Sequence, residues 1–326
     1  MKHISKGAVH LHSIYSDGTG TIEEIAKDAK KAGLDWIIIT DHNTLSSLHN
    51  GEEGWYDGVA VIIGNEISPD NCNHYLALGI SEEIPVDLPS EEIIKNVKSQ
   101  GGIGFIAHPD ESTTRKNKYR PLRWQDWTIR GFNGLEIWNF TSDWIDHYNA
   151  RVSVYCALAR HRIIKGPTSN IMKWWDELNN ETPEIITAIG GLDTHAFNFG
   201  FFKIFPYHDT FKTITNYLYL DKKLSQDINE AKKQVLDALK SGSNIIVNRI
   251  WNKNSNDDLS FTINEHKELF INLPQKAKIK LFRNGDLILE KKAKTLEFKG
   301  LLPGKYRFEA YHKNRPWIFS NPVMFQ

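Results

Sequence analysis

Residues 36–43 have the sequence WIIITDHN, in which four apolar residues lead directly into polar ones. A short apolar run bounded by polar residues is typical of a buried strand in a parallel sheet. His42 then lies where this strand ends. In parallel α/β barrels, the residues that carry the chemistry lie at the carboxyl ends of the strands. The segment therefore predicts a parallel α/β architecture with a functional site at one end.

Similar apolar runs alternate with helix patterns up to residue 253. We expect further strands at residues 7–11, 59–63, 75–80, 103–107, 134–138 and 185–189. We expect helices at residues 21–34, 90–100, 142–160 and 227–239. Thr21 and Glu24 have the spacing of a capping box, and Gly242 is a typical residue for a helix end. This alternation favours an α/β fold with a largely parallel sheet or barrel.

The pattern changes after residue 253, where the runs become short and alternating and no helix pattern is seen. Asn284-Gly285 is a strong signal for a two-residue hairpin turn. We interpret residues 254–258 as a linker and the remainder of the chain as a small all-β sandwich. The expected organisation is a barrel domain over residues 1–253 and an accessory β-sandwich domain over residues 254–326.

Composition excludes several classes of function. The 40 lysines and arginines balance 40 aspartates and glutamates, so general nucleic-acid binding is not indicated. A small phosphorylated substrate is compatible with this balance, because local charge can hold it. The N-terminus has no apolar stretch of signal-peptide length, and no apolar run is long enough to span a bilayer. We therefore expect a cytoplasmic protein that does not bind membranes.

Five clusters of histidines and carboxylates lie at or beside the expected strand ends. Their nine members are His10, His12, Asp17, His42, Glu66, His74, His108, Asp193 and His195. His10 and His12 occupy alternate positions, so a strand would direct both to one side, and Asp193 and His195 repeat this spacing. Such polar groups cost several kcal/mol unless they are paired or bind a metal, so chance clustering is improbable. Imidazole and carboxylate together suit zinc, iron or manganese.

These motifs follow one another in the order His-x-His, Ser-Asp-Gly, Thr-Asp-His, Glu, Asn-His, His-Pro and Asp-x-His. In this order the sequence resembles the PHP (polymerase and histidinol phosphatase) family over residues 3–250. The resemblance implies a distorted seven-stranded (β/α) barrel with a trinuclear metal centre. The implied ligands are His10, His12, Glu66 and Asp193 for one metal, Glu66, His74 and His108 for a second, and Asp17, His42 and His195 for a third. Glu66 bridges the first two. Asp17 stands where some relatives carry histidine.

The C-terminal residues 315–322 are similar to a β-domain found in a two-domain branch of this family. Some members of that branch cleave carbamate esters. Two alternatives to a phosphoesterase therefore stay open: a carbamate or other non-phosphate ester hydrolase, and a catalytically silent metal-binding scaffold. The intact ligand set argues against the silent scaffold.

We expect a metal-dependent phosphoesterase that acts on a small-molecule phosphate ester with two or three divalent ions of zinc, manganese or iron. Two ions bridged by Glu66 would activate a shared water for attack on phosphorus. Asp41 is a candidate acid, or else an ordinary hydrogen-bonding residue. Arg115 and Arg120, in the basic segment after His108, are candidates for phosphate binding, or else part of a solvated charge run.

Overall fold

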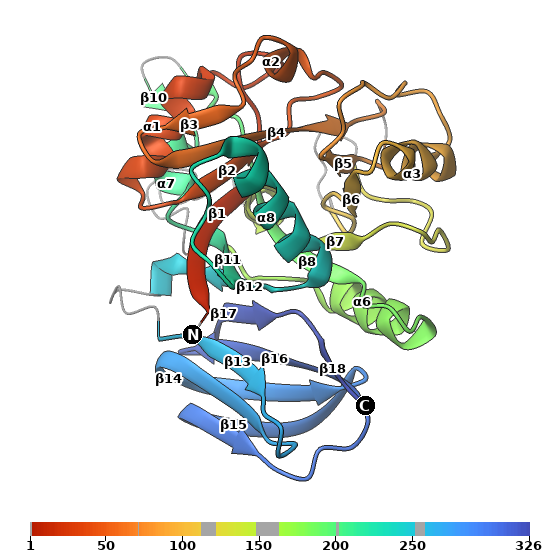
Figure 1. Cartoon of the computed structure of the whole chain (residues 1–326), viewed down its shortest axis with the longest axis vertical. Coiled ribbons are helices and arrows are strands. Elements are labelled where there is room, and N and C mark those ends of the chain that lie inside the picture. Colours follow the sequence, from red (N-terminus) through yellow and green to blue (C-terminus); the bar gives the residue numbers. More distant parts are fainter. Residues whose placement is uncertain (1, 71, 112–121, 148–162, 200–201, 252–257) are drawn as a thin grey trace.

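The computed structural model describes residues 2–70, 72–111, 122–147, 163–199, 202–251 and 258–326. Figure 1 shows a barrel with surrounding helices in the upper part of the molecule and a β-rich domain, which contains the C-terminus, below it. The expected α/β barrel followed by a β-domain is thus confirmed. Within the described ranges, no helix is both long and apolar enough to cross a membrane.

Seven strands close into the barrel in the order β1-β2-β4-β5-β6-β7-β8, and β8 pairs with β1. They are β1 (His3–Leu11), β2 (Trp36–Ile39), β4 (Val59–Ile67), β5 (Tyr75–Leu78), β6 (Ile103–Ile106), β7 (Gly134–Asn139) and β8 (Thr187–Thr194). Neighbouring strands are parallel except at β5, which is antiparallel to both β4 and β6. This reversal distorts the regular parallel barrel and places the start of β5 beside the ends of the other strands.

Strands β4 and β8 extend further than their apolar runs. β4 continues to Ile67 because residues 64–67 pair with β5, and β8 continues to Thr194 because its end pairs with β1. From the strands expected at residues 59–63 and 185–189, Glu66 and Asp193 were predicted to lie just after the strand ends. That expectation is wrong, since both residues lie within the strands.

Four long helices accompany the barrel: α1 (Ile22–Lys31), α3 (Ser90–Ser99), α6 (Ser169–Glu181) and α8 (Ile228–Ser241). The predicted capping box of α1 is present, with Glu24 N donating to Thr21 Oγ1 at 3.2 Å. α8 ends at Gly242, whose φ of 72° is the left-handed conformation that glycine adopts easily. The helix predicted at 142–160 is described only as α4 (Phe140–His147), and residues 148–160 lie outside the described part.

The shorter elements are α2 (Ser46–His49), α7 (Tyr207–Thr210), the 3-10 helix η3 (Arg249–Trp251), and the strands β3 (Gly54–Tyr56), β9 (Asn198–Phe199) and β10 (Phe202–Lys203). β3 pairs with β4, and β9 pairs with β10 as a small hairpin. This hairpin follows β8 closely in the chain, so it lies near the barrel end where β8 stops.

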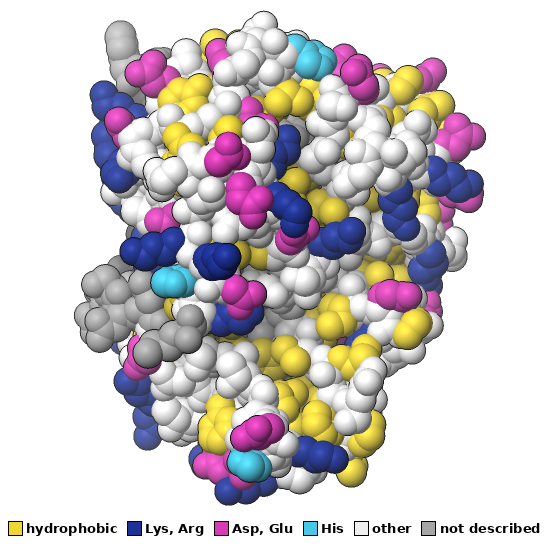
Figure 2. Space-filling view, in the orientation of Figure 1, with side chains coloured by type: hydrophobic (Ala, Val, Ile, Leu, Met, Phe, Trp, Pro, Cys, Tyr) yellow, Lys and Arg dark blue, Asp and Glu magenta, His cyan; other side chains and the backbone are white. Residues whose placement is uncertain are grey.

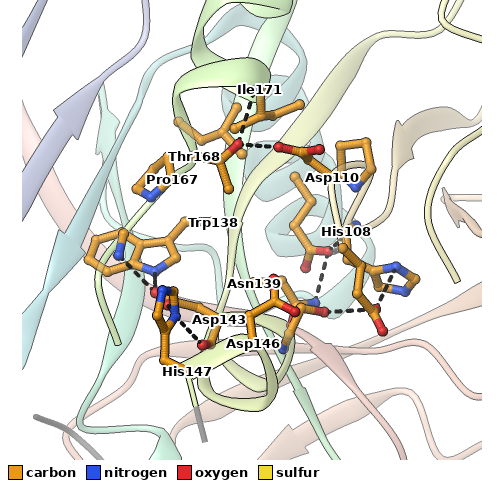
Figure 3. Close-up of a pocket in the computed structure, with 16 residues that line it drawn as sticks. His108, Asp110, Trp138, Asn139, Asp143, Asp146, His147, Pro167, Thr168 and Ile171 are labelled. Carbon is orange, nitrogen blue, oxygen red and sulfur yellow. Dashed lines mark hydrogen bonds and ion pairs between the residues drawn. The ribbon is translucent and has the colours of Figure 1, made fainter. Parts of the chain in front are cut away.

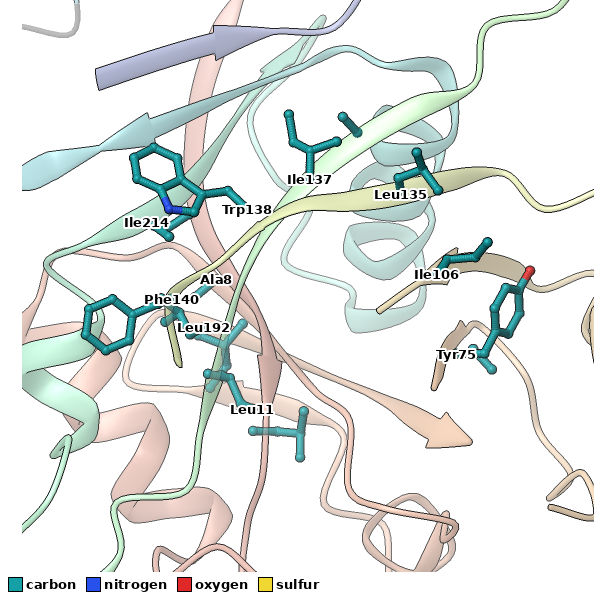
Figure 4. Packing of buried hydrophobic residues seen from close by; sticks show 14 of the residues in the cluster. Ala8, Leu11, Tyr75, Ile106, Leu135, Ile137, Trp138, Phe140, Leu192 and Ile214 are labelled. Atoms are coloured by element: carbon teal, nitrogen blue, oxygen red, sulfur yellow. The ribbon is translucent and has the colours of Figure 1, made fainter. Parts of the chain in front are cut away.

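The opening segment WIII is apolar throughout because β2 is buried on both faces. Ile37 belongs to the same apolar cluster as Ile25 of α1, whereas Ile38 belongs to a cluster with Val235 of α8. Figure 4 shows part of the first cluster, in which Leu11 and Leu192 of neighbouring strands pack together. Helices on both sides therefore account for the unbroken apolar run.

Two antiparallel strands connect the barrel to the β-domain. They are β11 (Ile214–Leu220) and β12 (Asn244–Asn248). β11 pairs with the first half of β1 through residues 3–7, while the second half of β1 pairs with β8. β12 in turn pairs with β17 (Arg315–Ser320). A continuous path of paired strands thus runs from the barrel into the β-domain, and neither β11 nor α6 was predicted.

The β-domain has six strands, all paired antiparallel: β13 (Ser260–Ile263), β14 (Leu269–Arg283), β15 (Asp286–Phe298), β16 (Gly304–His312), β17 and β18 (Val323–Phe325). The predicted Asn284-Gly285 turn joins β14 to β15, and both residues have positive φ. Buried side chains such as Leu281, Phe308 and Trp317 form a core that also includes residues of β11 and β12. Of the linker predicted at 254–258, residues 254–257 lie outside the described part.

Two buried cations of β16 hold helix α6 against the β-domain. Lys305 Nζ donates to the carbonyl oxygens of Asn179 (2.7 Å), Thr182 (2.7 Å) and Glu184 (2.5 Å), at and just beyond the end of α6. A cation near a helix C-terminus is favourable because the free carbonyl groups there carry partial negative charge. Arg307 donates two hydrogen bonds to Asp176 of α6, at 2.7 and 2.6 Å.

Charges of both signs are interspersed on the face shown in Figure 2. This distribution agrees with the equal totals of 40 basic and 40 acidic residues. On this face, the residues that the structure describes form no continuous basic surface of the kind that binds a nucleic-acid backbone.

Candidate metal centre

All nine candidate residues gather at one end of the barrel. They form four overlapping groups whose nitrogen and oxygen atoms lie within 4.8 Å of one another: His12, Asp17, His42 and His195; His10, His12 and Glu66; His10, His108 and Asp193; and Glu66, His74 and His108. His74 joins them although it precedes its strand, because β5 runs antiparallel to its neighbours. The expectation that these clusters meet at one site therefore agrees with the geometry.

Glu66 lies at the middle of the cluster and is fully buried. A parallel bridge joins the backbone of His42 to that of Glu66 and so sets their side chains side by side. The histidines within 3.4 Å of its carboxylate are His10, His12 and His42 beside Oε2, and His74 and His108 beside Oε1. One carboxylate thus links two different sets of imidazole groups.

Two aspartates complete the cluster toward solvent. Asp193 Oδ1 lies 3.3 Å from His12 Nε2 and 3.6 Å from His10 Nε2. Asp17 Oδ1 lies 3.1 Å from His195 Nε2 and 3.7 Å from His42 Nε2. The Asp17 side chain is 52 % exposed, whereas that of Asp193 is 14 % exposed. The group around Asp17 is therefore the open side of the cluster.

Three residues of the cluster have a backbone conformation that is rare outside glycine. The φ angles are 68° at His10, 27° at His108 and 52° at Asp193. At His10 the pairing of β1 with β8 also shifts register, which marks a bulge in the strand. Conformations of this kind are costly and concentrate at functional sites.

Several buried polar atoms of the cluster have no hydrogen-bond partner. They are His10 Nε2, His12 Nδ1 and Nε2, Glu66 Oε2 and His108 Nδ1. Leaving buried polar groups unsatisfied is unfavourable, and native proteins pair most of them. Imidazole nitrogens and carboxylate oxygens are also the atoms that bind divalent transition metals. The donor set therefore fits metal ions.

Burial and neighbouring charges shift the pKa values of the cluster in different directions. Burial, reinforced by the nearby charge of His195, lowers the pKa of His12 to about 3, so this imidazole is neutral. Burial opposes the ionisation of Glu66, but the charges of His10 and His74 outweigh it and hold its pKa well below the ordinary value. The pKa of Asp193 is lowered well below its ordinary value in the same way, chiefly by His10. Neutral imidazole and ionised carboxylate are the metal-binding forms, so His12, Glu66 and Asp193 already favour binding. At His10 and His108 burial lowers the pKa, but neighbouring carboxylates outweigh it and raise the pKa, to about 9 at His108. An ion bound by these two histidines would therefore displace protons.

Glu136 of β7 is a buried carboxylate that was not predicted. Its Oε1 lies 2.9 Å from His10 Nδ1, and its Oε2 accepts hydrogen bonds from the backbone N–H of His108 at 2.7 Å and from Asn139 Nδ2 at 3.0 Å. A Cβ atom at Gly191 would lie 1.5 Å from Oε1, so glycine makes room for this carboxylate. Glu136 therefore orients two members of the cluster. The sequence did contain a sign of this role, because a charged residue within the apolar run 134–138 is unusual and indicates a buried partner.

Asp41 lies beside the cluster, where its carboxylate is used within the protein. It accepts hydrogen bonds from Ser13 N at 2.7 Å, Ser13 Oγ at 2.6 Å and Ser16 Oγ at 2.6 Å. These contacts fix the turn between His12 and Asp17. Arg115 and Arg120, the expected phosphate-binding residues, lie outside the described part of the chain.

A pocket adjoins the cluster at His108 (Figure 3). One side of it is formed by the start of α6, where Thr168 Oγ1 donates to Asp110. Across the pocket, Asp143 accepts hydrogen bonds from Trp138 Nε1 at 2.9 Å and from the Gly166 N–H at 2.8 Å. These contacts fix the pocket walls and tie α6 to the loop that carries His108.

Comparisons with known proteins agree with this geometry. The PHP domain model matches residues 8–160. An uncharacterised protein of Methanocaldococcus jannaschii is 36 % identical in an alignment of 188 positions that covers 53 % of this chain and 99 % of that protein. The phosphoribosyl 1,2-cyclic phosphate 1,2-diphosphodiesterase of Eggerthella lenta is 34 % identical in an alignment of 83 positions that covers 24 % of this chain and 32 % of that enzyme.

A solved structure has the same two-part architecture. It is a two-domain protein of Bacteroides vulgatus described as containing a predicted PHP-like metal-dependent phosphoesterase. The match covers 99 % of this chain and 96 % of that one, with a TM-score of 0.51 and 15 % identity, and therefore shows the fold. The matching domain model, the relative aligned over nearly its whole length and the cluster at the barrel end together show that this chain belongs to the PHP family.

Proposed function

We propose that the protein is a metal-dependent phosphoesterase that hydrolyses a small phosphate ester. The observation that carries the proposal is the arrangement around Glu66, where one buried carboxylate joins two sets of histidines and several donor atoms lack partners. Local similarity to a phosphodiesterase of Eggerthella lenta supports the choice of a phosphate ester. The substrate class is thus inferred from the donor set and from this relative together.

The residues that would hold the ions are the nine of the cluster. We assign His10, His12, Glu66 and Asp193 to one ion, Glu66, His74 and His108 to a second, and Asp17, His42 and His195 to a third, as the resemblance to the family implies. The proximity of Asp193 Oδ1 to His10 and His12 supports the first set, and the close grouping of the other residues supports the second and third. Bound zinc, manganese or iron would supply an activated water near neutral pH and offset charge on the phosphate oxygens. His12 also lies within the Asp17 group, so the first and third sets of residues are adjacent.

The other residues act by holding this arrangement. Glu136 fixes the ring of His10 and the backbone of His108, so it preserves the distance between two ligand sets. We propose a positioning role for Asp41 in place of the expected proton donor, because three internal hydrogen bonds already occupy its carboxylate. Asp17, half-exposed, faces the side from which substrate arrives. Arg115 and Arg120 remain candidates for contact with the phosphate.

The domain assignment is a proposal of the same kind. We assign the metal chemistry to residues 1–253, which contain every candidate ligand, and an accessory role to residues 254–326. The contacts of Lys305 and Arg307 with α6 support a role for the β-domain in bracing the barrel.

The proposal is tested by screening the full-length protein, reconstituted separately with zinc, manganese and iron(II). The substrates are phosphomonoesters, phosphodiesters, nucleotides and carbamates. We expect metal-dependent release of phosphate or of a phosphomonoester, with activity more than about 100-fold lower in Glu66→Gln. Turnover of carbamates alone would replace the phosphoesterase with the carbamate hydrolase, and no turnover of any ester would favour the silent scaffold.

A further inference from the structure

A series of three parallel rings leads from the buried metal cluster to the surface. His12 and His195 stack with ring centroids 4.0 Å apart and an interplanar angle of 10°. Phe197 stacks in turn on His195 at 4.8 Å and 12°. His12 is fully buried, His195 is 8 % exposed and Phe197 is 43 % exposed. The outermost ring therefore offers an open apolar surface beside the half-exposed group of Asp17, His42 and His195.

The position of Phe197 is set by its surroundings. Ala196 has a φ of 52°, which is unusual for a residue other than glycine. Thr19 Oγ1 donates to the Ala196 carbonyl oxygen at 2.7 Å, and Ile204 N donates to the Phe197 carbonyl oxygen at 2.7 Å. An uncommon backbone conformation held by its neighbours is typical of a functional position.

Exposed apolar side chains are concentrated at this end of the barrel. Among the described residues, the exposed large hydrophobic side chains are Ile14, Phe197 and Ile204 in the barrel, and Leu287, Leu302 and Met324 in the β-domain. The three in the barrel all lie in segments that follow β1 or β8, at the ends that carry the metal cluster. Apolar surface beside a polar reaction centre is the usual lining of a small-molecule site.

We propose that Phe197 is a stacking platform for a planar ring of the substrate, so that the preferred substrates are phosphate esters with an aromatic or heteroaromatic group. This inference rests on the proposed phosphoesterase function. A phosphate bound at the group of Asp17, His42 and His195 would have its ester substituent next to the exposed face of Phe197. Aromatic rings and nucleobases stack favourably on such a face.

A binding measurement tests the platform without turnover. Phenylphosphonate and methylphosphonate share the charged group and differ in the ring, so calorimetric titration of the metal-loaded protein isolates the contribution of the ring. We expect wild type to bind phenylphosphonate about fivefold more tightly, which is the range of an aromatic pair. Phe197→Ala should remove this preference, and Phe197→Leu, which keeps apolar bulk without a ring, should retain only part of it. Leu302→Ala, at a similarly exposed apolar residue of the β-domain, should retain all of it.

Two binding results would overturn the inference. One is equal affinity of the wild type for the two phosphonates. The other is an equal loss of affinity for both phosphonates in Phe197→Ala, which would mean that Phe197 only shields His195 from water.

Kinetic measurements separate this inference from the proposed function. Hydrolysis of phenyl and alkyl phosphates with the same kcat/KM would reject the platform alone, whereas ring-dependent binding without hydrolysis of any ester would reject the phosphoesterase alone.

Discussion

The cluster of histidines and carboxylates at the barrel end and the contact between β16 and α6 both bury charged groups, but the two regions differ in how these groups are paired. In the β16 contact, Lys305 has three carbonyl partners and Arg307 is paired with Asp176 and Glu309. In the cluster, buried atoms of His10, His12, Glu66 and His108 have no hydrogen-bond partner. The first arrangement is complete within the protein and stabilises a helix position. The second needs a further component, which is what a binding site requires.

The largest expected effect comes from changing the centre of the cluster. Glu66→Gln keeps the size of the side chain but removes the negative charge that faces the surrounding histidines. We expect kcat to fall by more than about 100-fold, since even residues outside the ligand set change metal sites by 10- to 100-fold. The measurement is steady-state kinetics, and a far-ultraviolet circular dichroism spectrum verifies that the variant is folded. Glu177→Gln, on the surface of α6, is the control, and near-wild-type turnover in Glu66→Gln would remove Glu66 from the mechanism.

Disrupting the contact between β16 and α6 should lower the stability of the protein and leave the metal-binding capacity of the histidine and carboxylate cluster unchanged. Arg307→Met removes the cation between Asp176 and Glu309 and leaves those carboxylates poorly compensated. Removing one partner of a buried ion pair typically costs about 3–5 kcal/mol in the free energy of unfolding. Urea unfolding measures the loss, and elemental analysis of the folded variant should give the metal content of wild type. Loss of metal at unchanged stability would reverse the roles assigned to the two regions.

A smaller effect on the cluster is expected from the residue that orients it. Glu136→Gln can no longer accept from His10, His108 and Asn139 with an ionised carboxylate. We expect metal affinity, measured by competition with a chelator, to fall by about 10- to 100-fold. Gly191→Ala should have a similar effect, because its Cβ would displace the Glu136 carboxylate. Unchanged metal affinity in both variants would show that Glu136 stabilises the barrel core and does not orient the metal ligands.

The smallest effect is expected where charges are paired at the surface. Lys299 lies 3.0 Å from Glu268 and 2.8 Å from Glu297, but its side chain is 67 % exposed. Water and salt weaken such pairs, so Lys299→Ala should leave the urea midpoint unchanged within error. A shift as large as that of Arg307→Met would mean that burial is not what distinguishes the β16 contact.

Local patterns were sufficient to predict much of the fold and the candidate cluster. The apolar run at 36–39, the capping residues Thr21 and Glu24, and the turn at Asn284-Gly285 each depend on short-range physical rules, and each appears as predicted. The cluster residues were visible because histidines and carboxylates recur next to apolar runs.

Features that depend on distant contacts were not predicted. β4 and β8 extend through polar residues because β5 and β1 pair with them, which the local apolar pattern does not record. Glu136 looks like an unfavourable residue in a strand until His10 and His108 are brought against it. The role of α6 likewise depends on Lys305 and Arg307, which come more than 100 residues later in the chain.

The central claim, that the unsatisfied cluster is a multinuclear metal site, is tested most directly by metal stoichiometry. The full-length protein would be reconstituted with zinc, manganese or iron(II), dialysed against metal-free buffer and measured by elemental analysis. We predict two or three ions per chain in the wild type and fewer in Glu66→Gln. Fewer than one ion per chain with every metal, in a protein shown to be folded, would contradict the claim.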